Sequence, residues 1–543
     1  MQSIQGRIGW ASAATFFSAA VMAAGLSFGT APAQAAFELP EGEKITNVPA
    51  IPRAIPQKEA YELYDPKIGK NFDIKNFWIR ADLRVRPEMR NGVCFGGGSP
   101  VGGACNALNA NANAGKSAND QFVQQMTRLG IGYDLSPDVN FYMEIIDSRN
   151  WGSNGAPGTG GSNIDALNHN GGSVATNGNG GTLGVRAAYM LVRNFAGVQG
   201  LSVKAGRQYI VFGNHSLFGH FDWANTGFSH DGVMLQYSTK SFDSYLGYFR
   251  TSEGDQAQAA PVGSVGGNVV GGGVGQQGAT ADSNMIIWYN QIKSVPGFLI
   301  EPYYFLYSNG SPNGGAGVGN QAQGLGTNKH SNQTRHSVGN RIEMRKGNFD
   351  ATNEVTYQFG AMGDSGGQNA SPASLGNQKN LHISAWATRN WIGYTHYQSS
   401  WKPRLAFNFD DATGDGRANC TLAGSTATGC KTANTFENMF PTNHIHMGYM
   451  DVQAWKNMMS PSINFQARPT KDDHIEIWGT SLNLANKADN WYRGTQGVYV
   501  FSKNGNTKSH IGDELDVAWT HMFMDGKLAF QAAYGHQIGR AHV

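Results

Sequence analysis

The chain has 543 residues, of which only 15% are charged and 40% hydrophobic, and it contains 72 glycines and 11% aromatic residues. No run of about 18 apolar residues follows the N-terminal region, which excludes a helical membrane protein. The 41 basic and 39 acidic residues are not segregated into long blocks, so nothing indicates a nucleic-acid partner. The chain is therefore either soluble or a β-barrel, whose alternating strands hide their hydrophobicity from window averages.

Residues 1–35 predict a secretory signal peptide. Arg7 supplies the positive start, residues 8–28 are apolar and small, and Ala33-Gln34-Ala35 fits the small-x-small cleavage rule. A membrane anchor is the alternative, which is disfavoured because no charged stop-transfer flank follows. Residues 36–76 are rich in proline without a sustained period, and we interpret them as a periplasmic leader ahead of a barrel over residues 77–543.

The first predicted strand covers residues 77–90. Its odd-numbered positions are apolar from Phe77 to Val85, and its even-numbered positions from Arg80 to Arg90 carry six charges. Successive side chains of a strand point to opposite faces, so one face is apolar and the other is charged. A soluble strand also alternates, but its usual length is about 5–6 residues. A lipid-facing row and a wet interior explain the longer pattern.

The same pattern recurs along the chain, for example over residues 334–346 and 348–361. Short links such as Ser136-Pro137-Asp138 and Lys346-Gly347-Asn348 suit hairpin turns, and they alternate with long segments rich in Gly, Asn, Ser and Thr. This rhythm is typical of barrels with short periplasmic turns and long extracellular loops. We predict seventeen strands: 77–90, 121–135, 138–150, 183–194, 201–209, 228–238, 241–252, 283–295, 298–308, 334–346, 348–361, 380–397, 403–410, 454–467, 473–484, 509–521 and 526–538.

The fold class predicted is all-β, a transmembrane antiparallel β-barrel in the bacterial outer membrane. Because bacterial single-chain barrels have even strand numbers, we expect 18 strands, with the last one missing from this sequence. The 411–453 loop is the first candidate for a loop that folds inward as a gate.

The four cysteines form two local pairs, Cys94 with Cys105 and Cys420 with Cys430, each in a Gly-, Asn- or Thr-rich stretch. In an exported protein this arrangement predicts two disulfides that clip two loops. Metal ligation is the weaker alternative, because no CxxC spacing or cluster of histidines accompanies the cysteines.

Several strings at predicted strand ends carry a family resemblance. Across about residues 77–540 the chain resembles the alginate-export family of porins, on Asp147-Ser148-Arg149-Asn150-Trp151-Gly152, Gly206-Arg207-Gln208, Asp222-Trp223, Asp231-Gly232-Val233, Glu354, Tyr357-Gln358-Phe359-Gly360, Trp401-Lys402-Pro403-Arg404-Leu405, Thr413-Gly414-Asp415, Thr435-Phe436, Phe440-Pro441-Thr442, Gly448-Tyr449-Met450-Asp451 and Gly512-Asp513-Glu514-Leu515-Asp516. The resemblance implies an 18-stranded outer-membrane barrel with an electropositive, Arg-lined constriction that passes an anionic polysaccharide.

For a channel, the functional chemistry is the charged lining, because rings of Arg and Lys favour anions. The predicted pore-lining residues are Arg80, Arg84, Arg86, Arg90, Arg128, Lys204, Arg207, Arg341, Arg345, Glu354 and Arg404. Acidic residues such as Asp82, Glu476 and Glu514 share the inner face, so the predicted lumen is mixed in charge. Many of these residues pair across strands and hold the wall. The first strand carries an excess of arginine that could face an anion.

Other motifs predict no enzyme and no cofactor. Gly273-Val274-Gly275-Gln276-Gln277-Gly278 matches a dinucleotide fingerprint but lies outside any strand-turn-helix unit. The string from Asp411 to Gly416 resembles a calcium loop, yet it lacks the middle acidic ligand and the terminal Glu, so a bound Ca²⁺ is unsupported. His444 and His446 have no third metal ligand nearby, and no GxSxG hydrolase string occurs.

We therefore expect a passive channel for anionic oligosaccharides, polysaccharides or small polar solutes, with outer-membrane lipid and the solute as its partners. The alternative is a barrel that serves as a scaffold or anchor for a surface or periplasmic partner. Conductance in a planar bilayer separates the two hypotheses.

Overall fold

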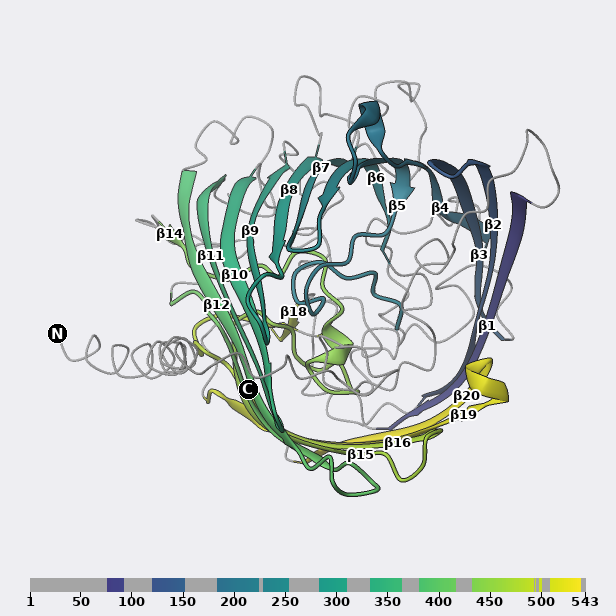
Figure 1. Ribbon diagram of the computed structural model, residues 1–543. Helices are drawn as coiled ribbons and strands as arrows, with labels where there is room; N and C mark the ends of the chain where they lie inside the picture. Colours follow the sequence, from purple (N-terminus) through teal and green to yellow (C-terminus); the bar gives the residue numbers. More distant parts are fainter. Residues whose placement is uncertain are drawn as a thin grey trace, which may run out of the picture.

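The computed structural model describes residues 76–91, 120–151, 183–223, 228–252, 283–309, 333–363, 380–416, 432–492, 494, 498–500 and 508–538. One sheet of 18 strands curves around a central space (Figure 1). Its long strands are β1 Phe77–Arg90, β2 Asp120–Ser136, β3 Val139–Asn150, β4 Leu183–Val192, β5 Leu201–Gln208, β6 His230–Ser238, β7 Phe242–Ser252, β8 Ser283–Ile292, β9 Phe298–Asn309, β10 Gln333–Lys346, β11 Phe349–Gly363, β12 Asn380–Thr395, β13 Arg404–Ala412, β15 Met458–Ala467, β16 Asp473–Asn483, β19 His510–Phe523 and β20 Leu528–Ile538.

The long strands form an antiparallel meander in which each pairs with its neighbours in the chain. The alternation predicted for the first strand is confirmed: in β1 every odd-numbered side chain from Phe77 to Met89 is exposed on the outer face, whereas Trp78, Arg84 and Glu88 on the even positions are partly covered. The two periodic faces of the sequence are thus the two faces of the barrel wall.

The seventeen predicted strands all occur, with small shifts at their ends. Residues 454–457, predicted as the start of a strand, turn into the barrel instead, and β15 begins at Met458. Three short strands were not predicted: β14 Thr432–Ala433, β17 Trp491–Tyr492 and β18 Val498–Val500. β12 is longer than its partner β13, and β14 pairs in parallel with the end of β12 that β13 does not reach. Within the part of the chain that the structure describes, β1 pairs only with β2 and β20 only with β19, so these two strands are the edges of the sheet.

Short and long connections alternate as predicted. The short turns lie at one end of the strands. Two of them contain a 3₁₀ turn, Phe195–Gly197 and Met524–Gly526, and a third is the two-residue link after β10. In that link Gly347 has a φ of 59°, which glycine adopts without steric cost. By the turn-length rule this end is periplasmic.

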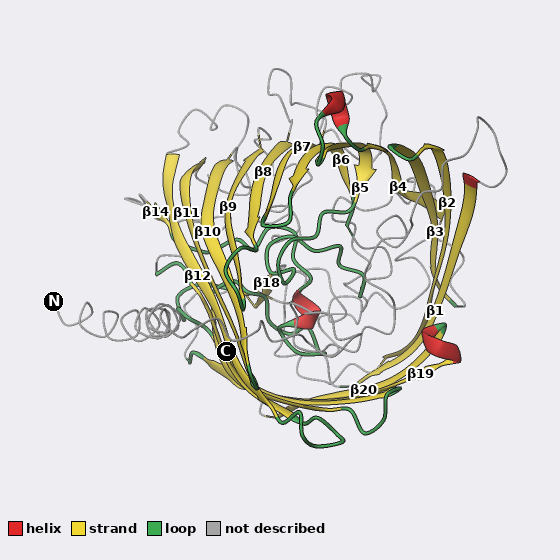
Figure 2. Ribbon diagram, viewed as in Figure 1, coloured by secondary structure: helices red, strands yellow, loops and turns green. Residues whose placement is uncertain are grey.

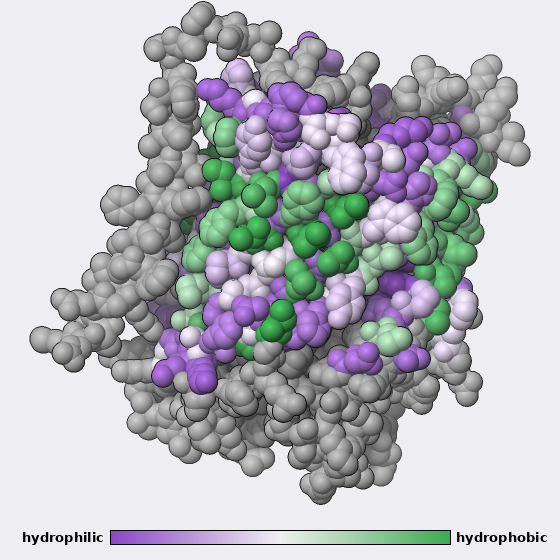
Figure 3. All heavy atoms as spheres, turned by 90° about the horizontal axis from the view of Figure 1, so that it is seen from below, coloured by the Kyte–Doolittle hydropathy of each residue, from purple (hydrophilic) through white to green (hydrophobic). Residues whose placement is uncertain are grey.

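Apolar side chains form a band on the outer face. Seen over β15, β16, β19 and β20, hydrophobic residues gather across the middle of the strands, with hydrophilic residues toward both ends (Figure 3). Exposed members include Ile463, Ile477, Val517 and Trp519. A band of this kind matches the lipid-facing belt of an outer-membrane barrel. No helix among the described residues is long and apolar enough to cross a membrane.

Candidate functional site

Two segments between strands lie inside the barrel (Figure 2). The first inner segment, residues 209–223, follows β5, and the second inner segment, residues 434–457, lies between β14 and β15 and includes the 3₁₀ turn Asn443–Ile445. Most side chains of both are buried. The second lies partly within the 411–453 loop that was predicted as a gate, whereas nothing in the sequence distinguished the first from the other long loops.

The two inner segments are joined to each other by backbone hydrogen bonds. Phe218 and Phe440 form a parallel β-bridge, and the Gly219 N–H donates to the Phe440 carbonyl at 2.8 Å. The Thr442 N–H donates to the His215 carbonyl at 3.0 Å, and the Thr442 hydroxyl accepts from the Phe221 N–H at 3.0 Å. The segments therefore act as one unit within the lumen.

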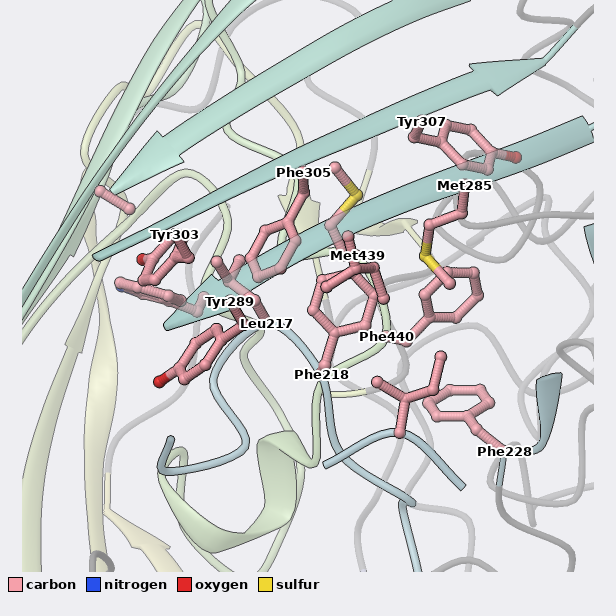
Figure 4. Packing of buried hydrophobic residues seen from close by; sticks show 14 of the residues in the cluster. Leu217, Phe218, Phe228, Met285, Tyr289, Tyr303, Phe305, Tyr307, Met439 and Phe440 are labelled. Atoms are coloured by element: carbon pink, nitrogen blue, oxygen red, sulfur yellow. The ribbon is translucent and has the colours of Figure 1, made fainter. Parts of the chain in front are cut away.

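A hydrophobic cluster fixes this unit against the wall formed by β7, β8 and β9 (Figure 4). The Phe218 ring packs on Phe305 with centroids 4.5 Å apart, and Phe212 stacks on Tyr289 at 4.4 Å. Burying one such side chain contributes roughly 1.5–3 kcal/mol. This part of the lumen is a packed core, which departs from the expectation that the whole interior is wet.

On another sector of the wall, four arginines contact the first inner segment. We call Arg84, Arg86, Arg128 and Arg186 the basic wall. Arg84 donates to the carbonyl oxygens of Asp222 and Trp223, and Arg86 donates to the Trp223 carbonyl at 2.6 Å. Arg128 Nη1 lies 3.1 and 3.0 Å from the two carboxylate oxygens of Asp222, and Arg186 Nη2 lies 2.9 Å from Oδ1.

The Asp222 carboxylate is held in its charged form by these arginines. Its burial alone would raise its pKa, but the charge of Arg128, followed by those of His220, Arg186 and Arg84, outweighs burial and holds the pKa of Asp222 well below its ordinary value. The group therefore carries its negative charge throughout the physiological pH range.

Arg186 reaches this site because of a β-bulge. Between β3 and β4 the register pairs Glu144 with Ala187 and Ile145 with Val185, which leaves Arg186 as the extra residue. A bulge re-aims the side chains of its strand, and here both Arg186 and Ala187 are fully buried. If β4 alternated strictly from Tyr189, which points inward, Arg186 would lie on the lipid face. The sequence therefore did not indicate Arg186 as an inward-facing residue.

An aromatic stack links the basic wall to the acidic sector described below. The Arg86 guanidinium lies 3.9 Å from the centre of the Trp223 ring, and Trp223 stacks on His444 with centroids 3.6 Å apart and planes 7° apart. His444 in turn stacks on Tyr449 at 5.2 Å, and its Nδ1 lies 2.8 Å from the Asp451 carboxylate. The stack therefore crosses from the first inner segment to the second.

Three buried carboxylates of β16 and β19 contact the second inner segment, and we call Glu476, Glu514 and Asp516 the acidic wall. Glu514 accepts from the Met450 N–H at 2.9 Å, Asp516 accepts from the Tyr449 N–H at 3.2 Å, and Glu476 accepts from the Tyr449 hydroxyl at 3.2 Å. Among the described residues none of the three forms an ion pair with a basic side chain. Gly448 has a φ of 87°, which glycine adopts without steric cost, and a Cβ at this position would lie 2.3 Å from Glu514 Oε1.

The structure places the predicted pore-lining residues in three groups. Arg80, Arg84, Arg86 and Arg128 face the lumen in the sector of the basic wall, and Arg80 pairs with Asp82 at 2.9 Å. Lys204 also points inward, with its Nζ 4.1 Å from the centre of the Tyr189 ring. The remaining inward residues sit in wall networks: Arg341 with Glu301 and Glu343, Arg345 with Glu343, Glu354 with Tyr303, and Arg404 with Asp350.

Arg207 is a correction to the predicted lining. It pairs with Asp231 at 2.7 Å and lies opposite it in the register of β5 and β6. Asp231 shares the exposed outer face with Val233 and Leu235. Since Lys204 points inward and the side-chain period of a strand is two, residue 207 must point outward. The side chain of Arg90 and all four cysteines lie outside the described residues.

The motifs that resembled metal sites have other partners. His446 Nε2 lies 2.7 Å from the Asn214 carbonyl, and burial lowers the pKa of His446 well below its ordinary value. The Asp415 N–H donates to the Asp489 carboxylate at 2.8 Å. Over the described ranges, no group of three His, Cys, Asp or Glu residues could hold a metal ion.

The curved antiparallel sheet, its apolar outer band and its charged interior define an outer-membrane β-barrel of the porin or channel class. The chain belongs to the alginate export family, whose sequence profile matches residues 118–543. The match begins after β1, so Arg84 and Arg86 precede the matched residues.

The solved structures to which the chain is similar include three bacterial proteins. Pseudomonas aeruginosa OccK9 (OpdG) has 10% identity and a TM-score of 0.45, with 87% of this chain and 96% of that chain covered. Acinetobacter baumannii OccAB1 has 12% identity and a TM-score of 0.43, with 87% and 93% covered. A BenF-like porin from Pseudomonas fluorescens Pf-5 has 10% identity and a TM-score of 0.42, with 87% and 96% covered. No curated protein sequence matches the chain.

Proposed function

We propose that this protein is a passive outer-membrane channel for anionic oligosaccharides or small polar anions, with its constriction at the two inner segments. The observation that supports this proposal best is the basic wall, where four guanidinium groups from β1, β2 and β4 point inward and contact the first inner segment. Cationic linings attract anions and exclude cations. The acidic wall lies in a different sector, so an anion can follow the basic side of the lumen.

Two finer features of the sequence belong to the same proposal. Residues 1–35 act as a signal peptide that is removed during export. Cys94 with Cys105, and Cys420 with Cys430, form disulfides that restrain two extracellular loops, as suits an oxidising compartment.

A second candidate function follows from the packed core of Figure 4. Because the inner segments are joined to each other and to the wall by buried aromatic contacts, they could fill the lumen completely. The barrel would then act as a scaffold or anchor for a surface or periplasmic partner, without conducting.

Planar-bilayer recording of the purified protein tests the channel against the scaffold. We expect discrete conductance steps, a reversal potential on the anion side, and block by alginate oligomers. Replacing two arginines of the basic wall, Arg84→Ala with Arg86→Ala, should shift the reversal potential toward cations. The control Arg207→Ala removes one positive charge from the outer face and should leave the reversal potential unchanged. A silent bilayer would refute the channel and favour the scaffold.

A further inference from the structure

Four short turns at the periplasmic end of the sheet form one continuous edge between β10 and β20. The turns are residues 346–348, 396–403, 468–472 and 524–527. Backbone hydrogen bonds connect each turn to the next along the edge: from Thr395 N–H to the Asn348 carbonyl at 2.8 Å, from Arg468 N–H to the Trp401 carbonyl at 2.8 Å, and from Met522 N–H to the Asp472 carbonyl at 2.9 Å. The structure describes every residue of these turns, so their charges can be counted completely.

This edge is basic. Its turns contain five lysines and arginines but only two acidic residues, Asp472 and Asp525. We call the basic residues the basic rim: Lys346, Lys402, Arg468, Lys471 and Lys527. The Lys471 side chain is 84% exposed, and its Nζ lies 3.9 Å from Asp472, a distance at which an exposed pair is weak.

Two further members of the basic rim carry charge that the chain does not neutralise. Arg468 and Lys527 are both exposed, and among the described residues neither forms an ion pair. The edge therefore presents a positive surface to whatever lies beside the periplasmic end of the barrel.

The outer face next to this surface is apolar. In three of the turns, an exposed apolar residue of the outer face follows a basic residue within three positions: Phe349 after Lys346, Leu405 after Lys402, and Leu528 after Lys527. A strand rises about 3.3 Å per residue, and the headgroup region of a bilayer is about 5–8 Å thick on each side. With the apolar band of Figure 3 in the hydrocarbon, the basic rim lies at the depth of the headgroups.

Trp401 lies at the same depth. It belongs to the turn 396–403, its side chain is 55% exposed, and its carbonyl oxygen accepts from the Arg468 N–H. Tryptophan is enriched at membrane–water interfaces, where its ring sits at the level of the headgroups. The exposed indole beside a guanidinium group thus suits the boundary between acyl chains and phosphates.

We propose that the basic rim binds the phosphate groups of acidic phospholipids, such as phosphatidylglycerol, in the periplasmic leaflet. Guanidinium and ammonium groups donate charge-assisted hydrogen bonds to phosphate oxygens, while the acyl chains cover the neighbouring apolar residues Phe349, Leu405 and Leu528. A soluble anion would use the charge alone, so the adjoining apolar residues favour a lipid. Binding of lipid at this edge goes beyond the proposed channel function and does not depend on whether the barrel conducts.

The attraction should be cumulative and sensitive to salt. Each lysine or arginine close to an anionic lipid surface strengthens association about fivefold. The basic residues of the rim are exposed at the surface, where salt screens charges that lie more than a Debye length apart. Acidic lipid should therefore be preferred at low ionic strength and lose its advantage at high ionic strength.

Quenching of Trp401 fluorescence by brominated lipids tests the proposal on the full chain in phosphatidylcholine vesicles. Subtracting the signal of the Trp401→Phe variant isolates this residue from the other tryptophans. Brominated phosphatidylglycerol should associate beside Trp401 at least about fivefold more strongly than brominated phosphatidylcholine. In about 1 M salt the ratio of the two association constants should fall toward one. A ratio of one at low salt would overturn the proposal.

The double variant Arg468→Gln with Lys471→Gln removes two charges beside Trp401 and should reduce the ratio to less than half of its wild-type value. The matched control is Lys487→Gln with Lys508→Gln, because both lysines are exposed and follow the extracellular end of β16. The control should keep the wild-type ratio. Equal ratios in the two double variants would refute a role for the basic rim. Should the first double variant not fold, Lys471→Gln alone provides the comparison.

Alginate oligomers distinguish a lipid site from a solute site. Added to protein in vesicles of pure phosphatidylcholine, they should leave the Trp401 fluorescence unchanged. A response to alginate without any preference for phosphatidylglycerol would assign the basic rim to the solute and refute the binding of lipid.

Discussion

The basic wall and the acidic wall hold the same pair of inner segments, but they do so in opposite ways. Arg128 and Arg186 pair with the charged carboxylate of Asp222, and Arg84 and Arg86 donate to backbone carbonyl oxygens of the same segment. Glu514 and Asp516 accept from the backbone N–H groups of Met450 and Tyr449, and in the described chain no cation pairs with them. The inner segments are therefore held by ion pairing together with hydrogen bonding at the basic wall, and by hydrogen bonding alone at the acidic wall.

The largest effect is expected on the basic side. Arg186→Met keeps the size of the side chain but leaves Asp222 partly uncompensated, and breaking a buried pair in this way costs about 3–5 kcal/mol. Amide hydrogen exchange of residues 209–223 should accelerate while that of the strands stays slow. The control Arg207→Met breaks an exposed pair on the outer face, which is worth about 0–1 kcal/mol. Equal exchange in the two variants would show that ion pairing does not hold the first inner segment.

A smaller effect is expected on the acidic side, and it should depend on the acceptor rather than on the charge. Glu514→Ala leaves the Met450 N–H without its acceptor, which costs about 1–3 kcal/mol. Glu514→Gln retains an acceptor oxygen and should be close to neutral. Hydrogen exchange at Tyr449 and Met450 measures both. A Gln variant as damaged as the Ala variant would mean that the negative charge itself matters, and the two walls would then be alike.

The smallest effect concerns pH. Burial raises the pKa of the Asp489 carboxyl to about 6, although the Thr435 hydroxyl and the Asp415 N–H donate to it. Because the folded-state pKa lies above the unfolded value, protonation stabilises the fold: the contribution is present at low pH and is lost as the pH rises through about 6. Between pH 5 and 7.5 the loss is on the order of 1 kcal/mol.

Hydrogen exchange of residues 434–438 and 489–492, corrected for the intrinsic pH dependence, should therefore be slower at pH 5 than at pH 7.5. Asp489→Asn should remove this difference. An unchanged difference in that variant would assign the pH response to other groups.

Much of the fold could be predicted from the sequence because strand alternation is a local property. The period of two in residues 77–90 follows from backbone geometry, and the lipid fixes which face is apolar. The same period contradicts the prediction that Arg207 lines the pore. Lys204 and Arg207 lie an odd number of positions apart on one strand, so they point to opposite faces. The candidate site was only partly predictable: Arg84, Arg86 and Arg128 follow the alternation, but Arg186 escapes it through the bulge.

The sequence by itself determined the wall: seventeen long strands, their inner and outer faces, and the alternation of short and long connections. These features depend on neighbouring residues and on the surrounding lipid. Only the tertiary structure decided what fills the lumen. Asp222 meets Arg84 across 138 positions of the chain, and His446 meets Asn214 across 232. Contacts at such separations depend on how the sheet curves and where the inner segments pack, and no local period encodes either.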